Sequence, residues 1–264
     1  MKNRITKKFV ELKSARRGGF IPFIVAGDPD LETTKELILE LARQNASVIE
    51  LGVPFSDPVA DGVTIQASAE RALRNPISVR DILQTVADVR NEGCGTPIIL
   101  FSYFNPILQF GLENFAAKAV ESGVDGILIT DLVPEEAEEF RGILAAKNLA
   151  LIMLAAPTSS DERLMKICEK ASGFVYAVSR AGVTGARNET SSDAQTLVKR
   201  LRKYTDLPIA VGFGISSAAQ IEETWKYADA AVVGSAIVAE IGRLNDSPNL
   251  IEEIKDFVEN LLPN

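Results

Sequence analysis

The sequence predicts an α/β protein, a single (β/α)8 TIM barrel, and two observations support this prediction. Eight short apolar runs alternate with segments whose apolar residues recur every three or four positions, over a chain of 264 residues. The runs are almost continuously apolar, as strands covered on both faces of a parallel sheet are. No linker or shift in composition divides the chain, so we expect residues 1–264 to form one domain. An open doubly wound sheet is the alternative.

The eight strand candidates are rich in β-branched and other apolar residues. In chain order they are FIPFIVAG (20–27), VIELG (48–52), PIILFS (97–102), DGILIT (125–130), LALIML (149–154), GFVYAVS (173–179), LPIAVGFG (207–214) and DAAVVGSA (229–236). Amphipathic helices are expected between them, most clearly over 30–45, 78–93 and 159–173.

The expected helix ends carry residues that suit them. Ser78 and Ser160 are of the type that accepts a hydrogen bond at a helix N-cap, and Gly93 and Gly173 suit C-caps. Residues 5–15, ITKKFVELKSA, are expected to form an extra N-terminal helix that covers the bottom of the barrel.

The composition excludes several classes of function. A formal charge of −8 argues against a nucleic-acid partner. No stretch approaches the ~20 apolar residues of a membrane span, and the basic N-terminus lacks the apolar core of a signal peptide, so we expect no membrane contact and a cytoplasmic location. Cys94 and Cys168 are expected to be buried free thiols. The chain has no histidine, which excludes Ser-His-Asp catalysis and histidine-ligated zinc.

Three acids lie where the second predicted strand ends, in VIELGVPFSDPVADG. Glu50 lies inside the strand between Ile49 and Leu51, where burial raises the pKa of a carboxyl toward values useful for proton transfer. The alternative is a structural carboxylate that accepts backbone or hydroxyl hydrogen bonds. Asp57 and Asp61 follow in the loop, where an aspartate is most often an Asx turn or a helix N-cap. Because barrel chemistry lies at the carboxyl ends of the strands, Glu50 is a candidate catalytic residue.

Two glycine-containing turns near the C-terminus predict a phosphate site. VGFGISS (211–217) and VVGSAIV (232–238) each place glycine where a strand ends and serine where a helix begins, and the loops after strands 7 and 8 frequently bind phosphate in barrels. Glycines that only form turns are the alternative. The polar segment from Ser179 to Ser192 is a candidate lid over this site, with an ordinary surface loop as the alternative.

Seven motifs occur together in a recognisable order: PFIVAGDP, ELGVPFSDPVADGVTIQ, SYFNP, APTSSDER, SRAGVTGA, GFGISS and VVGSAIV. In order and spacing the chain resembles the tryptophan synthase α subunit family, the indole-3-glycerol-phosphate lyases, over essentially its whole length. ELGVPFSDPVADG and SRAGVTGA are highly specific for it. The resemblance implies a reversible retro-aldol cleavage of indole-3-glycerol phosphate to indole and glyceraldehyde 3-phosphate, with no metal and no organic cofactor.

The resemblance also implies roles for individual residues. Glu50 falls on the family's catalytic glutamate and Asp61 on its catalytic aspartate, with Tyr176 beside the reacting centre. Further positions implied are Phe23, Phe101, Leu128, Leu154 and Phe213 for an indole pocket, Gly185, Gly214, Gly234 and Ser235 for the phosphate, and Thr184 and Asp57 for lid closure and coupling to a partner.

The partner that the resemblance implies is the tryptophan synthase β subunit, in an α2β2 complex that makes tryptophan from the released indole. Two alternatives stay open. One alternative is the same lyase acting alone and releasing free indole. The other is a non-catalytic barrel that activates a β subunit. The presence of both Glu50 and Asp61 argues against the non-catalytic alternative.

Overall fold

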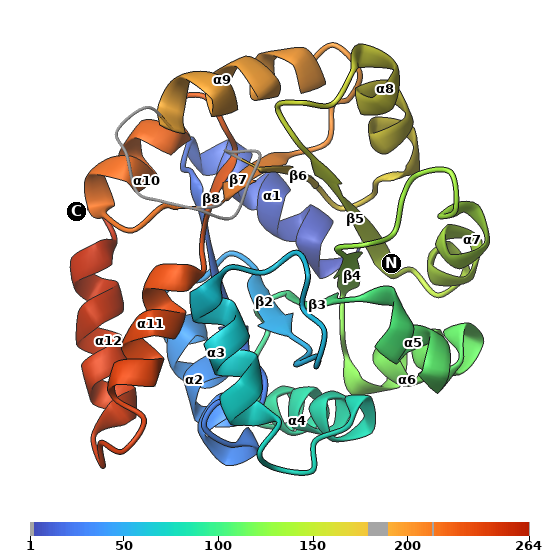
Figure 1. The fold of residues 1–264 in the computed structure, drawn as a ribbon. Helices are drawn as coiled ribbons and strands as arrows, with labels where there is room; N and C mark the ends of the chain where they lie inside the picture. Colours follow the sequence, from blue (N-terminus) through green and yellow to red (C-terminus); the bar gives the residue numbers. More distant parts are fainter. Residues whose placement is uncertain (1–2, 179–189, 213, 264) are drawn as a thin grey trace.

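The computed structural model describes residues 3–178, 190–212 and 214–263, and its eight strands close into a parallel barrel (Figure 1). In order around the barrel the strands are β1 (Gly19–Val25), β2 (Ile49–Gly52), β3 (Ile98–Ser102), β4 (Gly126–Ile129), β5 (Ala150–Ala155), β6 (Val175–Val178), β7 (Ile209–Gly212) and β8 (Ala230–Val233). β8 pairs with β1, from Gly19 opposite Ala230 to Pro22 opposite Val233. The predicted (β/α)8 barrel is therefore confirmed, and the open doubly wound sheet is wrong.

Twelve helices surround or close the barrel within the part of the chain that is described. They are α1 (Arg4–Ala15), α2 (Leu31–Arg43), α3 (Val63–Ala72), α4 (Val79–Asn91), α5 (Phe104–Phe110), α6 (Leu112–Ser122), α7 (Glu138–Ala146), α8 (Asp161–Lys170), α9 (Thr190–Leu201), α10 (Ala218–Trp225), α11 (Ser235–Arg243) and α12 (Leu250–Leu261). Two helices follow each of β2, β3 and β8, a doubling that the sequence pattern did not predict.

Three of the four predicted helix caps are confirmed. Ser78 accepts from the amide of Asp81 in a reciprocal capping box, and Ser160 accepts from the amide of Arg163. Gly93 follows α4 with φ +88°. The prediction for Gly173 is wrong, because α8 ends at Lys170 and the extended backbone at its C-cap, residue 171, turns the chain out of the helix earlier.

The N-terminal helix α1 closes the amino end of the barrel, as predicted. Its apolar face, with Ile5, Phe9 and Leu12, is buried in one cluster with side chains of the barrel interior. Just before the helix, the Asn3 amide donates to the backbone carbonyls of Asp125 (2.7 Å) and Asn148 (2.8 Å), which precede β4 and β5. These contacts fix the helix under the strands.

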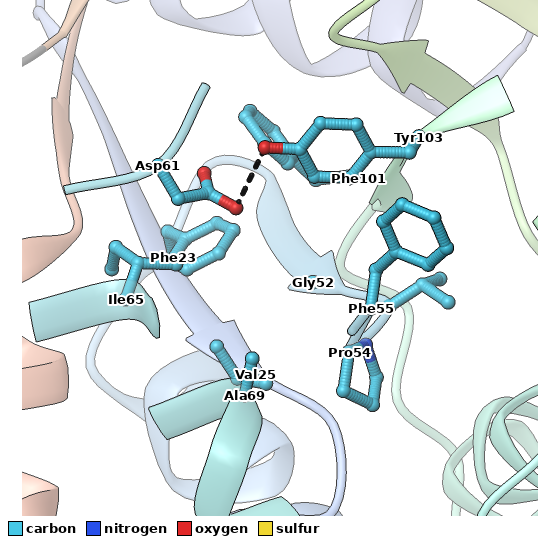
Figure 2. Close-up of a pocket in the computed structure, with 11 residues that line it drawn as sticks. Phe23, Val25, Gly52, Pro54, Phe55, Asp61, Ile65, Ala69, Phe101 and Tyr103 are labelled. Carbon is cyan, nitrogen blue, oxygen red and sulfur yellow. Dashed lines mark hydrogen bonds between the residues drawn. The ribbon is translucent and has the colours of Figure 1, made fainter. Parts of the chain in front are cut away.

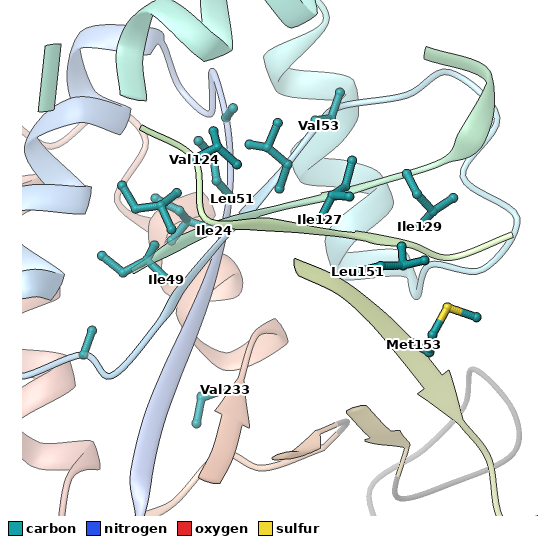
Figure 3. Packing of buried hydrophobic residues seen from close by; sticks show 14 of the residues in the cluster. Ile24, Ile49, Leu51, Val53, Val124, Ile127, Ile129, Leu151, Met153 and Val233 are labelled. Atoms are coloured by element: carbon teal, nitrogen blue, oxygen red, sulfur yellow. The ribbon is translucent and has the colours of Figure 1, made fainter. Parts of the chain in front are cut away.

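Alternate residues of each strand enter two different apolar clusters. The outer cluster fills the space between strands and helices and includes Ile49 and Leu51 of β2 (Figure 3). The inner cluster fills the barrel and includes Phe23 of β1 and Ile99 of β3, which flank Glu50 in the strand register. Because side chains alternate along a strand, Glu50 points into the barrel.

Two aspartates at the amino end, Asp125, which is buried, and Asp229, which is partly exposed, repeat one arrangement. Asp125, just before β4, accepts from the backbone amide of Ile98, the first residue of β3 (2.9 Å), and pairs with Arg90 of α4 (2.9 Å). Asp229, just before β8, accepts from the amide of Ile209, the first residue of β7 (2.7 Å), and pairs with Arg202 after α9. Each aspartate thus joins two neighbouring strands to a helix.

The chain's one tryptophan lies at the same end of the barrel. The Trp225 indole N–H, at the end of α10, donates to the carbonyl of Gly19 (2.8 Å). Its ring lies so close to Gly18 that a Cβ there would come within 2.1 Å of it. Glycine is therefore required at 18 for α10 to dock beside the first strand.

The predictions about the cysteines and about membrane spans can both be compared with the structure. Cys168 is buried and free, and burial raises the pKa of its thiol to about 11, whereas Cys94 is free but only half-buried. Among the described helices, none has the length and apolar character needed to cross a membrane.

Arg90 and Arg4 bind the same buried carboxylate, so they provide a matched pair of variants. Arg90 is 11% exposed and also donates to the carbonyls of Cys94 and Thr96, whereas Arg4 is 45% exposed. We expect Arg90→Met to lower the free energy of unfolding by about 3–5 kcal/mol, because Asp125 loses its buried partner. Arg4→Met should cost less than about 1 kcal/mol. Urea unfolding measures both, and equal losses would contradict this account.

Candidate active site

A pocket opens at the carboxyl ends of β1, β2 and β3 (Figure 2). The side chains and backbone that line it come from these strands, from the loop after β2 and from α3: Phe23, Val25, Gly52, Val53, Pro54, Phe55, Asp61, Ile65, Ala69, Phe101 and Tyr103. The pocket is apolar except for one carboxylate and one phenol. Such a lining suits a flat, mostly apolar ligand with a single polar atom.

Glu50 is fully buried, one inward-facing position before Gly52 of the pocket wall. Among the described residues, neither carboxyl oxygen has a hydrogen-bond partner, so the predicted alternative of a structural carboxylate with backbone or hydroxyl donors is wrong. Burial raises the pKa of Glu50 to about 8. A buried carboxyl without a partner is costly, and such groups cluster at functional sites.

Tyr176 of β6 reaches the same interior from across the barrel. It is buried in the inner cluster, and burial raises the pKa of its phenol well above the usual range, with the charge of Glu50 acting in the same direction. A Cβ at Gly212 of β7 would lie 2.0 Å from the phenol oxygen. Glycine at 212 therefore makes room for the Tyr176 hydroxyl near Glu50.

Asp61 lies at the rim of the pocket, and its carboxylate accepts a hydrogen bond from the Tyr103 hydroxyl (3.1 Å; Figure 2). The N-cap of α3 is Gly62, which shows that Asp61 is not the helix cap that its position in a loop also suggested. Burial raises the pKa of Asp61, and the hydrogen bond from Tyr103 partly opposes the rise.

The predicted indole pocket is partly assembled in this structure. Phe23 and Phe101 line the pocket with their rings edge to face, 5.2 Å between centroids. Leu128 is fully buried and Leu154 packs against the same inner cluster, but neither lines the open pocket. Glu50 itself is 0% exposed in this structure.

The predicted phosphate site lies where β7 and β8 end, and its two turns differ. At α10 the Ser217 hydroxyl caps the helix, and Gln220 accepts from the amide of Ser216 (2.8 Å). At α11 the N-cap Gly234 provides no side-chain cap, and Ser235 is exposed. The first-turn amides of α11 are thus the better place for an anion. Gly214 is also exposed, beside the capped turn.

The remaining predicted residues divide into two groups. Asp57 is exposed on the loop after β2, where it accepts from the Ser56 hydroxyl (2.6 Å), away from the pocket lining. Thr184, Gly185 and Phe213 lie outside the described residues. The lid was predicted to extend to Ser192, but helix α9 already begins at Thr190, so the last part of the predicted lid is helical.

Two residues of the site were missed by the sequence analysis. Tyr103 binds Asp61, and the Gln66 amide donates to the backbone carbonyl of Asp61 (2.9 Å). The available signal for Tyr103 was its place in SYFNP, directly after the third strand, where barrel side chains reach the active site. Within the described ranges, no three acidic, cysteine or histidine side chains lie together as a metal site would need.

Comparison with known proteins gives one consistent family. The sequence model of the family described as tryptophan synthase alpha chain matches residues 9–262. A tryptophan synthase alpha chain from Caulobacter sp. (strain K31) is 48% identical over 256 residues, which cover 96% of this chain and 92% of that protein.

Solved structures agree. The tryptophan synthase subunit alpha from Legionella pneumophila superposes with a TM-score of 0.91 at 34% identity, covering 99% of this chain and 97% of that one. A chain of the tryptophan synthase α2β2 complex from Pyrococcus furiosus superposes with a TM-score of 0.86 at 43% identity, covering 92% and 97%.

The raised pKa of Glu50 predicts how stability depends on pH. The folded protein keeps this proton up to about pH 8, whereas the unfolded chain releases it near pH ~4.3. The free energy of unfolding therefore contains a contribution that falls as pH rises between these values. Glu50→Gln cannot release a proton, so it should match the wild type near pH 5 and exceed it by about 3–5 kcal/mol near pH 8.5.

Urea unfolding at the two pH values measures this difference. Glu222→Gln, on the exposed face of α10, removes a carboxyl outside the barrel and is the control. If the curves of Glu50→Gln and wild type stay parallel from pH 5 to 8.5, Glu50 does not carry the raised pKa.

Proposed function

This chain belongs to the tryptophan synthase alpha chain family, and on that premise we propose that Glu50 and Asp61 carry out its lyase reaction. The chain is the enzyme that cleaves indole-3-glycerol phosphate to indole and glyceraldehyde 3-phosphate in tryptophan biosynthesis. The observation that supports the assignment most is the fully buried carboxyl of Glu50, which has no hydrogen-bond partner within the described ranges and lies just inside a pocket that carries a second acid. The proposal takes residues 1–264 as one domain.

Glu50 begins the reaction as an acid. With a pKa of about 8 it is mostly protonated at neutral pH, so it donates its proton to C3 of the indole ring. The ring nitrogen then becomes a cationic N–H. Asp61, at the rim of the pocket, accepts a hydrogen bond from this N–H and stabilises the charge.

Glu50 then acts as a base. Its carboxylate takes the proton of the glycerol hydroxyl next to the bond that breaks, and a C=O bond forms as the C–C bond breaks. The electrons of the broken bond return to the indole ring and neutralise its nitrogen. Glu50 ends protonated, so the cycle needs no net proton.

Tyr176 and the phosphate site orient the glycerol chain in this proposal. The raised pKa of Tyr176 keeps it a neutral phenol, which can hydrogen-bond the reacting hydroxyl near Glu50. The uncapped N-terminus of α11, with Gly234 and Ser235, holds the phosphate, and Gly214 contributes from the neighbouring turn. The indole lies against Phe23 and the apolar residues that accompany it in the inner cluster.

A β subunit binds at the rim of this pocket in the proposal, to form an α2β2 complex in the cytoplasm. The loop after β2 and the start of α3 expose two apolar side chains there, Val59 (82% exposed) and Val63 (81% exposed). Asp57 lies on the same loop. Because the loop carries both Asp61 and this surface, contact with a partner acts directly on a catalytic residue.

Removal of either carboxylic acid tests the reaction. We expect Glu50→Gln and Asp61→Asn each to lower turnover of indole-3-glycerol phosphate by ~10²-fold or more, since each removes a proton carrier or charge from the reacting centre. Indole release in a coupled assay measures the rate, and circular dichroism checks the fold. Near-normal turnover of Glu50→Gln would remove it from the mechanism.

The same assay with and without added β subunit separates the two catalytic alternatives. Strong activation by the β subunit supports an α subunit that works in a complex, whereas full activity of the isolated chain supports a lyase that works alone.

A charge at the start of α11 tests the phosphate site. Ser235→Asp places a carboxylate where the phosphate binds, so KM for indole-3-glycerol phosphate should rise at least ~10-fold, from lost helix-terminus contacts and charge repulsion. Turnover at saturation should change much less. Ser14→Asp, on the exposed face of α1 at the opposite end of the barrel, is the control and should leave KM unchanged. An unchanged KM in Ser235→Asp would place the phosphate elsewhere.

A further inference from the structure

We infer that Tyr103 is the positioning residue for Asp61, aiming its carboxylate at the indole nitrogen and keeping it ionised. This inference rests on the proposed function for its catalytic consequence, but the contacts that carry it are independent of the substrate. They are the hydrogen bonds of the Tyr103 hydroxyl with Ala60 and Asp61 and the backbone contacts of the loop that carries Asp61.

The Tyr103 hydroxyl bridges the loop after β2. It accepts from the backbone amide of Ala60 (2.8 Å) and lies 3.1 Å from a carboxylate oxygen of Asp61. A phenol has one proton, and an N–H can only donate. The amide of Ala60 therefore uses the oxygen as an acceptor. The Thr130 side chain also contacts the hydroxyl, and the phenol proton goes to the charged carboxylate of Asp61, which is the strongest acceptor among these groups.

The phenol itself has little freedom to move. Tyr103 is 3% exposed, directly follows β3 and is the N-cap residue of α5. The ring of Phe55 lies against it, 5.2 Å between centroids. The next amide, of Phe104, donates to Asp131 (2.7 Å) and fixes the backbone. The phenol is thus a rigid reference for the carboxylate.

Other contacts hold the backbone of Asp61, so the phenol acts on the side chain. The amide of Asp61 donates to the carbonyl of Pro58 (3.0 Å), and the Gln66 side chain donates to the carbonyl of Asp61 (2.9 Å). Loss of the Tyr103 hydroxyl leaves both contacts in place. The expected result is a freed carboxylate on an intact loop.

The phenol also sets the charge of Asp61. Burial raises the pKa of Asp61, and the hydrogen bond from Tyr103 lowers it. The other acids nearby have separate contacts, since Glu50 faces Tyr176 inside the barrel and Asp57 accepts from Ser56. Asp61 must be ionised to stabilise the positive charge of the indole N–H, and removal of the phenol disfavours that state.

Tyr103→Phe is the test, because it removes the hydroxyl and keeps the ring. We expect the acid limb of the pH profile of kcat/KM to move up by about one unit, with the alkaline limb, set by Glu50, unchanged. At the acid side, kcat/KM should fall by about tenfold or more, as for loss of a hydrogen bond to a charged group. Tyr227→Phe, which removes a phenol hydroxyl after α10, should leave the profile unchanged. A uniform loss at every pH, with no shift of the limb, would overturn the inference.

A second measurement needs no turnover. NMR titration of 13C-labelled aspartate carboxyls, with the Asp61 signal assigned by Asp61→Asn, gives the pKa of Asp61 directly. A higher pKa in Tyr103→Phe than in wild type supports the positioning role, and an equal pKa contradicts it. Absence of turnover in the wild-type protein would instead refute the proposed function and leave this readout valid.

Discussion

The burial of Glu50, with no hydrogen-bond partner among the residues that the structure describes, is the constraint on which the rest of the site depends. A carboxyl among apolar side chains holds its proton at neutral pH, so the barrel interior itself supplies an acid where the chain has no histidine. That environment exists only because the barrel is closed at β1 and β8 and covered at its amino end by α1. The proposed chemistry therefore depends on the completeness of the fold as well as on two side chains.

The two ends of the barrel treat acids in opposite ways. At the amino end, Asp125 accepts from a backbone amide and two arginines, so its charge is satisfied and joins strands to helices. Inside the carboxyl end, Glu50 has no donor in the part of the chain that the structure describes, and Asp61 accepts from a phenol. The first arrangement stabilises the fold. The second raises the pKa of Glu50, so that it can exchange a proton with a substrate, but the free energy of unfolding then falls as pH rises.

The sequence predicted most of what depends on local pattern. Eight apolar runs and their spacing predict the closed barrel. Glu50 can be recognised as a candidate functional residue because burial of a carboxyl within a strand costs free energy. Tyr103 could not be assigned a role in this way, since its bond to Asp61 joins residues 42 apart in the chain. The difference between the turns before α10 and α11 depends on whether a serine side chain folds back onto the helix, which the similar GIS and GSA patterns do not reveal.

The docking of Trp225 against Gly18 makes the protein its own fluorescent reporter. The single indole ring of the chain is held at the seam where the last strand meets the first, between segments 206 residues apart. The fluorescence emission of Trp225 should therefore change when β1 and β8 separate. The ring lies at the end of the barrel opposite the pocket. An experimenter can thus follow closure of the ring of strands from an intrinsic optical signal, in variants whose catalytic end has been altered, without attaching a dye.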